Sequence, residues 1–67
     1  MNYAEIKNIL RKNEFLLNGV LFDSEKTLTY RTDCEKMNQN LIVLLKKNNI
    51  KFSQKGCRVG ITTKIKF

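Results

Sequence analysis

The first apolar residues of the chain recur at helical spacing. Asn2 precedes Glu5 by three residues, which is the pattern of an N-cap side chain that binds the first turn of a helix. The apolar residues of this segment are Ile6, Ile9 and Leu10. Their spacing predicts a helix over residues 3–12.

The next segment, residues 15–22, is apolar on both faces and rich in strand-forming residues. The polar residues 23–26 follow as a turn, and residues 27–31 then alternate threonine with Leu28 and Tyr30. This pattern predicts two strands joined as a hairpin.

A second helix is predicted over residues 33–47. Thr32 and Asp33 offer N-cap oxygens, and Glu35 completes a capping box with Thr32. The apolar stripe consists of Met37, Leu41, Leu44 and Leu45, widened by Ile42 and Val43. Asn48 and Asn49 predict a left-handed end to this helix.

The last third of the chain predicts a second hairpin, with a strand over residues 50–53, a turn over 54–56 and a strand over 57–67. The odd-numbered residues of the last strand are apolar residues, a cysteine and a threonine, whereas Arg58, Lys64 and Lys66 lie among the even-numbered ones. A strict period of two indicates a strand with one covered face.

These elements predict one α+β domain over residues 1–67, in the order αββαββ. Each helix has a single apolar stripe, so we expect both helices on one face of a four-stranded antiparallel sheet. Residues 9–13 also resemble residues 44–48, so the halves, about 1–32 and 33–67, could form a pseudo-twofold repeat. Five matched positions of common residue types can equally arise by chance.

Positive charge is confined to the second half of the chain. Residues 1–33 carry five basic and five acidic side chains, whereas residues 34–67 carry eight basic side chains and only Glu35 as an acid. The formal net charge of +7 therefore belongs entirely to residues 34–67. A surface with one sign of charge concentrates anionic partners around it.

We expect the protein to bind nucleic acid, DNA or RNA, through phosphate contacts from this basic surface. The predicted contacts are Lys46, Lys47, Lys51, Lys55, Arg58, Lys64 and Lys66. Because lysine outnumbers arginine, we expect contacts to the backbone rather than readout of base edges. Two alternatives stay open: a solvated strand face whose lysines prevent aggregation, and a surface for an acidic protein partner.

The first hairpin suggests a protein interface, because its opening strand is apolar on both faces and a two-layer domain covers only one. The predicted interface residues are Phe15, Leu17, Val20 and Phe22. A homodimer formed there would enlarge the small core of a 67-residue chain. The alternative function is therefore a small adaptor or inhibitor that binds and modulates a host protein, with a phage as one candidate source.

No enzymatic function is expected, and no cofactor or metal is predicted. The chain has no histidine, its three glycines form no nucleotide-binding motif, and Cys34 and Cys57 lack the spacing of a zinc site. We expect free thiols rather than a disulfide. A metal-dependent nuclease built on Asp23 and Asp33 is the weaker alternative, since a turn and a helix start explain both residues.

The sequence further predicts a soluble, cytoplasmic protein that does not enter a membrane. No charged region followed by an apolar run opens the chain, and the longest apolar stretch, Leu41–Leu45, is far below the roughly 20 residues needed to span a bilayer. Abundant asparagine and lysine without proline are typical of an A+T-rich genome, whether of a bacterium, a plasmid or a phage.

Two resemblances are partial. The segment from Ile6 to Phe15, followed by a hairpin, resembles the start of small mRNA-interferase toxins with a double-stranded-RNA-binding-like fold. That family uses a catalytic histidine, which this chain lacks. The helix-hairpin repeat is similar in element order to half of a LAGLIDADG homing endonuclease, but the acidic motif is absent. The sequence is therefore assigned to no family.

Overall fold

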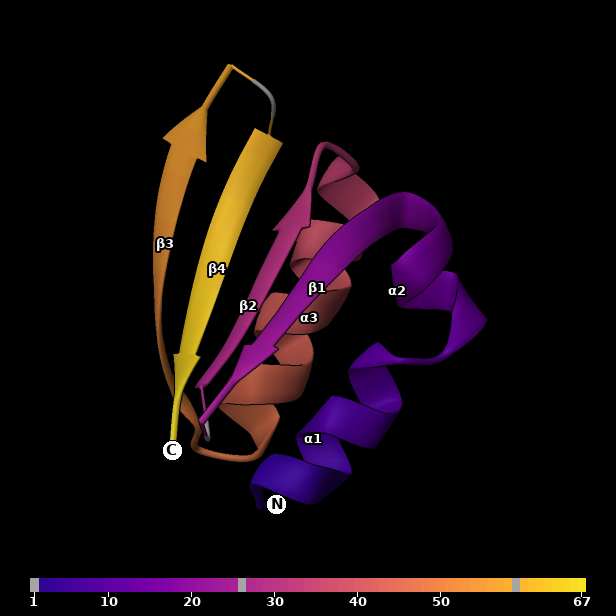
Figure 1. Ribbon diagram of the computed structural model, residues 1–67. Coiled ribbons are helices and arrows are strands. Elements are labelled where there is room, and N and C mark those ends of the chain that lie inside the picture. The colour runs from indigo at the N-terminus through magenta and orange to yellow at the C-terminus, as the bar shows by residue number, and fades with distance from the viewer. Residues whose placement is uncertain (1, 26, 59) are drawn as a thin grey trace.

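Three helices cover one face of a four-stranded antiparallel sheet (Figure 1). The computed structural model describes residues 2–25, 27–58 and 60–67, with the side chain of Cys57 outside the described part. Its elements are α1 (Tyr3–Leu10), α2 (Asn13–Asn18), β1 (Gly19–Ser24), β2 (Thr27–Thr32), α3 (Glu35–Lys47), β3 (Lys51–Cys57) and β4 (Gly60–Lys66). The predicted α+β class and the antiparallel sheet are confirmed. Within the described residues, none of the helices is both long and apolar enough to cross a bilayer.

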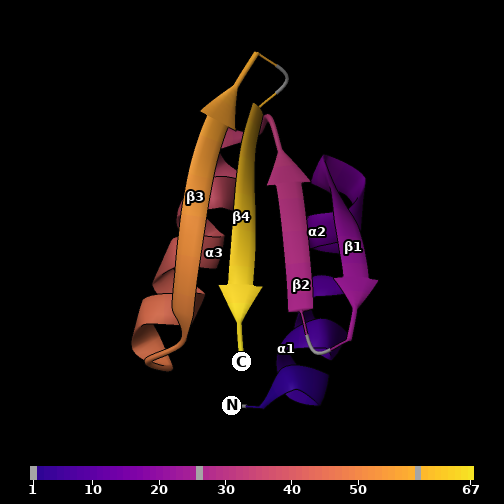
Figure 2. The ribbon, with the colours of Figure 1, turned by 60° about the vertical axis from the view of Figure 1, so that its left-hand side comes forward.

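The sheet has the strand order β1-β2-β4-β3, so two hairpins meet along an antiparallel β2–β4 pair. All helices lie behind the sheet in Figure 2, with α1 and α2 behind β1 and β2 and with α3 behind β4 and β3. The opposite face of the sheet is therefore left uncovered. We call it the open face.

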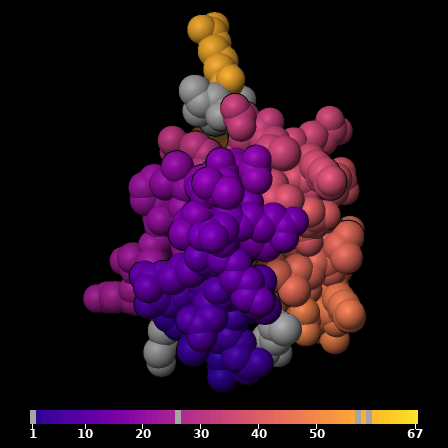
Figure 3. Space-filling model, turned by 90° about the vertical axis from the view of Figure 1, so that its right-hand side faces the viewer, coloured from indigo at the N-terminus to yellow at the C-terminus, as the bar shows by residue number. Residues whose placement is uncertain are grey.

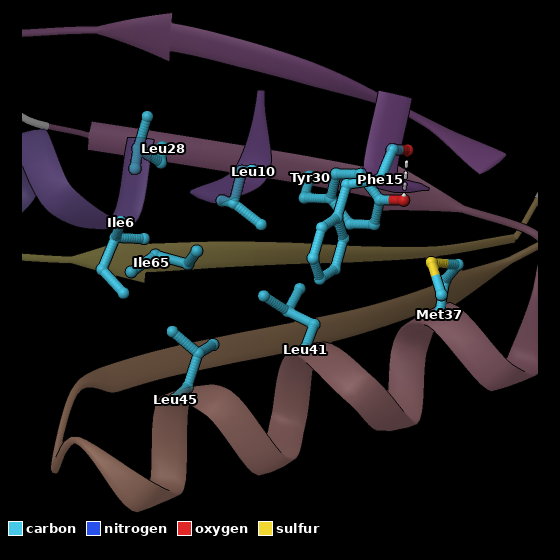
Figure 4. Packing of buried hydrophobic residues seen from close by; sticks show 9 residues of the cluster. All are labelled: Ile6, Leu10, Phe15, Leu28, Tyr30, Met37, Leu41, Leu45 and Ile65. Carbon is cyan, nitrogen blue, oxygen red and sulfur yellow. Dashed lines mark hydrogen bonds between the residues drawn. The ribbon is translucent and has the colours of Figure 1, made fainter. Parts of the chain in front are cut away.

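The core fills the space between the sheet and its helices. It consists of Ile6, Leu10, Phe15, Leu28, Tyr30, Met37, Leu41, Leu45 and Ile65 (Figure 4). Helices α1 and α3 contribute residues at helical spacing, β2 contributes the alternate residues Leu28 and Tyr30, and β4 contributes Ile65, because each element buries one face. A polar bridge also joins α3 to the sheet: the Gln54 side-chain amide donates to Asn38 at 2.8 Å and to Thr63 at 3.0 Å.

The prediction of a strand over residues 15–22 is wrong, because its first half forms helix α2. The Tyr30 hydroxyl donates to the Phe15 carbonyl oxygen at 2.7 Å, and the Thr32 hydroxyl donates to the Asn18 carbonyl oxygen. The last carbonyl groups of a helix have no hydrogen-bond donor within the helix. Two side chains of β2 therefore supply the donors for the carbonyl groups at the end of α2. A six-residue helix is unstable in isolation, and these tertiary contacts stabilise it.

The close approach of α2 to β2 requires a glycine at position 19. A Cβ atom there would lie 2.5 Å from both the Tyr30 hydroxyl oxygen and the Arg31 carbonyl oxygen. The backbone of Gly19 is extended, so the requirement is one of space rather than of conformation.

The turn of the second hairpin is also displaced from its predicted position. Residues 54–56 belong to β3, which ends at Cys57, and β4 begins at Gly60. Gly60 has φ 128°, a conformation that favours glycine, and a Cβ atom there would lie 2.4 Å from the Thr32 carbonyl oxygen. Gly60 rather than Gly56 therefore serves the turn.

Helix α3 begins two residues later than predicted. Cys34 is its N-cap residue and makes no side-chain capping bond; the Thr32 hydroxyl instead accepts from the Cys34 N–H at 3.0 Å. Val43 does not widen the buried stripe, since it is 63% exposed. The left-handed end is confirmed by Asn49, with φ 55°, and the Asn2 cap of α1 is confirmed by its bond from the Glu5 N–H at 3.0 Å.

Replacing Tyr30 with phenylalanine should lower the free energy of unfolding by about 1–2 kcal/mol, because the Phe15 carbonyl loses its buried donor. Urea denaturation followed by circular dichroism measures this loss. Tyr3→Phe is the matched control, since it removes an exposed hydroxyl from Asp23 that water can replace, and its effect should be smaller. Equal losses in both variants would contradict this account of Tyr30.

Stability should also fall at alkaline pH because of Tyr30. Burial raises the pKa of its hydroxyl above the ordinary value of 10.0, and the neighbouring Thr32 hydroxyl partly offsets that rise. Above about pH 10 the unfolded chain loses this proton while the folded chain keeps it, so the free energy of unfolding decreases with pH. The stability difference between the wild type and Tyr30→Phe should therefore narrow above pH 10. A constant difference in urea titrations from pH 8 to 11 would contradict it.

Candidate nucleic-acid interface

The open face is a regular grid of side chains. The strands pair residue by residue, so partners share a face and every second residue of each strand points away from the helices. Twelve described side chains point outward, and in cross-strand order they are Ser24, Thr27, Lys66 and Lys51; Phe22, Thr29, Lys64 and Ser53; and Val20, Arg31, Thr62 and Lys55. Five are cationic, five carry a hydroxyl group, and two are apolar.

In the part of the chain that the structure describes, no cation of this face has an acidic partner. Among the described residues, the ion pairs join Lys7 and Arg11 of α1 to Asp23, whose carboxylate lies on the helix side of β1. None of the grid positions holds an acid, and Lys51 lies directly opposite Lys66. Like charges placed opposite each other across a sheet are destabilising, so this arrangement is not explained by stability. An anionic partner would relieve the repulsion.

The grid also contains an aromatic side chain. Phe22 is 51% exposed, and the Arg31 guanidinium carbon lies 5.9 Å from the centre of its ring. This distance is that of a cation–π pair. The face therefore carries its four lysines on β4 and β3. On β1 and β2 it carries the aromatic ring of Phe22 beside the Arg31 guanidinium.

The chain termini lie at one end of the sheet (Figure 2). A groove of about 420 Å³ adjoins the grid there. Lys51 and Lys66 belong both to the grid and to the lining of this groove. The rings of Tyr3 and Phe67 meet edge to face beside it, with centres 5.4 Å apart. The groove thus places aromatic rings and asparagine side chains next to two cations of the grid.

The structure brings together four of the seven predicted phosphate contacts: Lys51, Lys55, Lys64 and Lys66. Lys46 and Lys47 lie on the last turn of α3, in the layer behind the sheet. Arg58 lies between the end of β3 and the start of β4, and β3 extends beyond the helices at that end of the sheet in Figure 1. The open face therefore holds fewer of the predicted phosphate contacts than the sequence analysis expected.

Sequence reasoning missed Arg31 and gave Phe22 a different role. Arg31 belongs to the half of the chain with no net charge, so counting charge along the sequence hid it. The alternation of Thr27, Thr29 and Arg31 with Leu28 and Tyr30 contained the necessary information, because it places Arg31 on the outward side of its strand.

The predicted protein interface is divided by the fold. Phe15 is buried in the core at 7% exposure, so it cannot contribute to a surface, and the prediction for this residue is corrected. Leu17 is 82% exposed on α2, while Val20 and Phe22 lie on the open face of β1. The fold separates these residues because residues 13–18 form a helix rather than a strand.

The two carboxylates of the nuclease alternative do not come together. Asp23 pairs with Leu28 near one end of the first hairpin, and Asp33 follows Thr32 at the other. The Asp23 carboxylate already binds Lys7 at 2.6 Å and accepts from the Tyr3 hydroxyl. Within the described part of the chain, no three histidine, cysteine or acidic residues gather as a metal site. Cys34 is a free thiol, and the prediction for Cys57 lies outside the described residues.

Comparisons with protein-family models, with curated proteins and with solved structures found no match for this chain.

Proposed function

We propose that this protein binds nucleic acid through the open face of its sheet. The observation that supports this function is the set of five cations, Arg31, Lys51, Lys55, Lys64 and Lys66, on a face where none of the twelve described side chains is acidic. Phosphates are the anions such a set can contact repeatedly, since its cations are spread over three strands and all three rows of the grid. The five hydroxyl groups between them can donate hydrogen bonds to phosphate oxygens.

Contacts to the sugar–phosphate backbone should contribute more to the binding affinity than contacts to the bases. Four of the five cations are lysines, which bind phosphate as point charges, and the face has one arginine for bidentate recognition. Affinity should therefore depend strongly on salt and weakly on sequence. We place this non-enzymatic activity in the cytoplasm, in keeping with the free thiol of Cys34.

We further propose that the two hairpins form a pseudo-twofold repeat. The pairings within the two hairpins are related by one shift of 33 residues, which carries Thr27–Thr32 onto Gly60–Ile65. This shift differs from the offset of 35 between residues 9–13 and 44–48, so the proposed repeat concerns the hairpins and not the helices. Under this shift Leu28 matches Ile61, Thr29 matches Thr62, and Arg31 matches Lys64. The two central strands then present equivalent cations on the open face, on either side of the β2–β4 seam.

A protein-binding function is the second candidate, favoured by the exposed apolar residues of α2 and β1. Leu16, Leu17, Val20 and Phe22 are each at least 45% exposed. Strand β1 is also an edge strand with no outward charge, whereas the other edge, β3, presents Lys51 and Lys55. An edge without charge can accept a strand from another protein or from a second copy of this chain.

The first prediction from the main proposal uses two variants with the same change in charge. Replacing Lys51, Lys64 and Lys66 together with glutamine should weaken binding to generic DNA and RNA by at least tenfold and reduce the slope of log affinity against log salt by about 2. Replacing Lys36, Lys46 and Lys47 with glutamine, on α3, should change binding much less. Fluorescence polarisation across a salt series measures both. Equal losses would show that net charge rather than the open face binds, and no binding by the wild type at low salt would refute the function.

The second candidate predicts an interaction that does not depend on salt. A Leu17→Glu and Val20→Lys double variant should lose it, because both changes place charge on the exposed apolar surface. Light scattering at rising concentration detects self-association, and affinity purification with the variant as control detects another protein. A monomeric wild type that enriches the same proteins as the variant would contradict this candidate.

A further inference from the structure

We infer that the open face binds single-stranded nucleic acid, with one base stacked on Phe22 beside Arg31 and with the backbone crossing the lysines of β4 and β3. This inference rests on the proposed function and specifies the form of nucleic acid that the same surface takes. Three observations support it: the breadth of the face, the exposed ring, and the arrangement of charge around one row of the grid.

The breadth of the open face disfavours a duplex. Adjacent strands lie about 4.8 Å apart, so the outer strands of a four-stranded sheet are separated by about 14 Å. The major groove of B-form DNA is about 12 Å wide, and the face as a whole cannot enter it. Figure 2 shows no helix on this side of the sheet that could enter in its place. A single strand can instead lie flat across the sheet.

The exposed ring of Phe22 provides a stacking surface for a base. It lies at one end of the middle row of the grid, Phe22-Thr29-Lys64-Ser53. Its neighbours on the grid are Val20, Ser24 and Thr29, and the Arg31 guanidinium beside it can stack on the same base or contact its phosphate. Single-strand-binding proteins combine these features, an aromatic platform within a cationic groove.

The remaining cations flank that middle row. Lys66 and Lys51 lie in the row on one side, Arg31 and Lys55 lie in the row on the other, and Lys64 lies within it. A backbone that follows the row from Phe22 towards β3 therefore passes between cations, with the hydroxyl groups of Thr29 and Ser53 directly beneath it. A backbone on this path passes beside all five cations of the grid.

The test compares labelled single strands of about 12 nucleotides, as oligo-dT and oligo-rU, with a mixed-sequence duplex of similar length. The wild type should bind at least one single strand more tightly than the duplex. Phe22→Leu should weaken single-strand binding about tenfold, because an apolar side chain remains but the stacking ring is lost. The salt slope should stay unchanged in this variant, since phenylalanine contacts no phosphate, whereas Lys64→Gln should reduce it.

Phe22→Tyr is the conservative control, which keeps the ring and should retain binding. Single-strand binding that is unaffected by Phe22→Leu would overturn the stacking contact. Tighter binding to duplex, lost on replacing Arg58 with glutamine, would overturn the inference in favour of the projecting β3–β4 tip, while leaving nucleic-acid binding intact (Figure 3). Absence of binding to all three probes would refute the proposed function together with the inference.

Discussion

The fold depends on two hydroxyl groups of strand β2. Tyr30 and Thr32 donate to backbone carbonyls at the two ends of the segment Phe15–Asn18, which ties helix α2 to the sheet. The same Thr32 oxygen accepts from the Cys34 N–H, where the chain enters α3. One strand therefore positions both the helix before the first hairpin and the helix after it. Because Tyr30 and Thr32 point towards the helices, their neighbours Thr29 and Arg31 must point to the open face.

This arrangement explains how so small a chain can leave half of its sheet uncovered. All of the core residues lie on the helix side, where α1 and α3 bury their apolar stripes against β2 and β4. Acidic Asp23 is directed to that side as well and is paired there with Lys7 and Arg11 of α1. The side chains at the outward positions are consequently not needed to form the core. These positions hold five cations that have no acidic partner within residues 2–25, 27–58 and 60–67, and this concentration calls for a functional explanation.

Periodicity predicted those parts of the fold in which one face is buried and the other is not. The alternation along β4 separated buried Ile65 from exposed Lys64 correctly, and the stripe of α3 was correct at Met37, Leu41 and Leu45 but not at Val43. Helix α2 could not be predicted in this way, because three consecutive apolar residues, 15–17, fit a helix and a strand equally well. Hydrogen bonds from Tyr30 and Thr32 favour the helix. The second turn depended likewise on a tertiary contact, the approach of Gly60 to Thr32.

The candidate site was predicted in part for a related reason. Charge counted along the sequence identified the lysines of β3 and β4, but it joined them to Lys46 and Lys47 of α3 and left out Arg31. Membership of a surface is decided by strand pairing, and the β2–β4 register could not be read from local sequence. That register places Thr29 opposite Lys64 and Arg31 opposite Thr62, which unites the two halves of the chain in one face.

Nuclear magnetic resonance tests the central claim most directly, since it reports on each backbone amide of this 67-residue chain. An oligonucleotide is titrated into the isotopically labelled protein, and the shifts of amide signals are mapped onto the structure. The account predicts that the largest shifts fall on the outward positions of the four strands, with Phe22, Arg31 and Lys64 among them, and that the exposed side of α3 is little changed. Shifts concentrated on Lys46 and Lys47, or confined to the tip near Arg58, would contradict it.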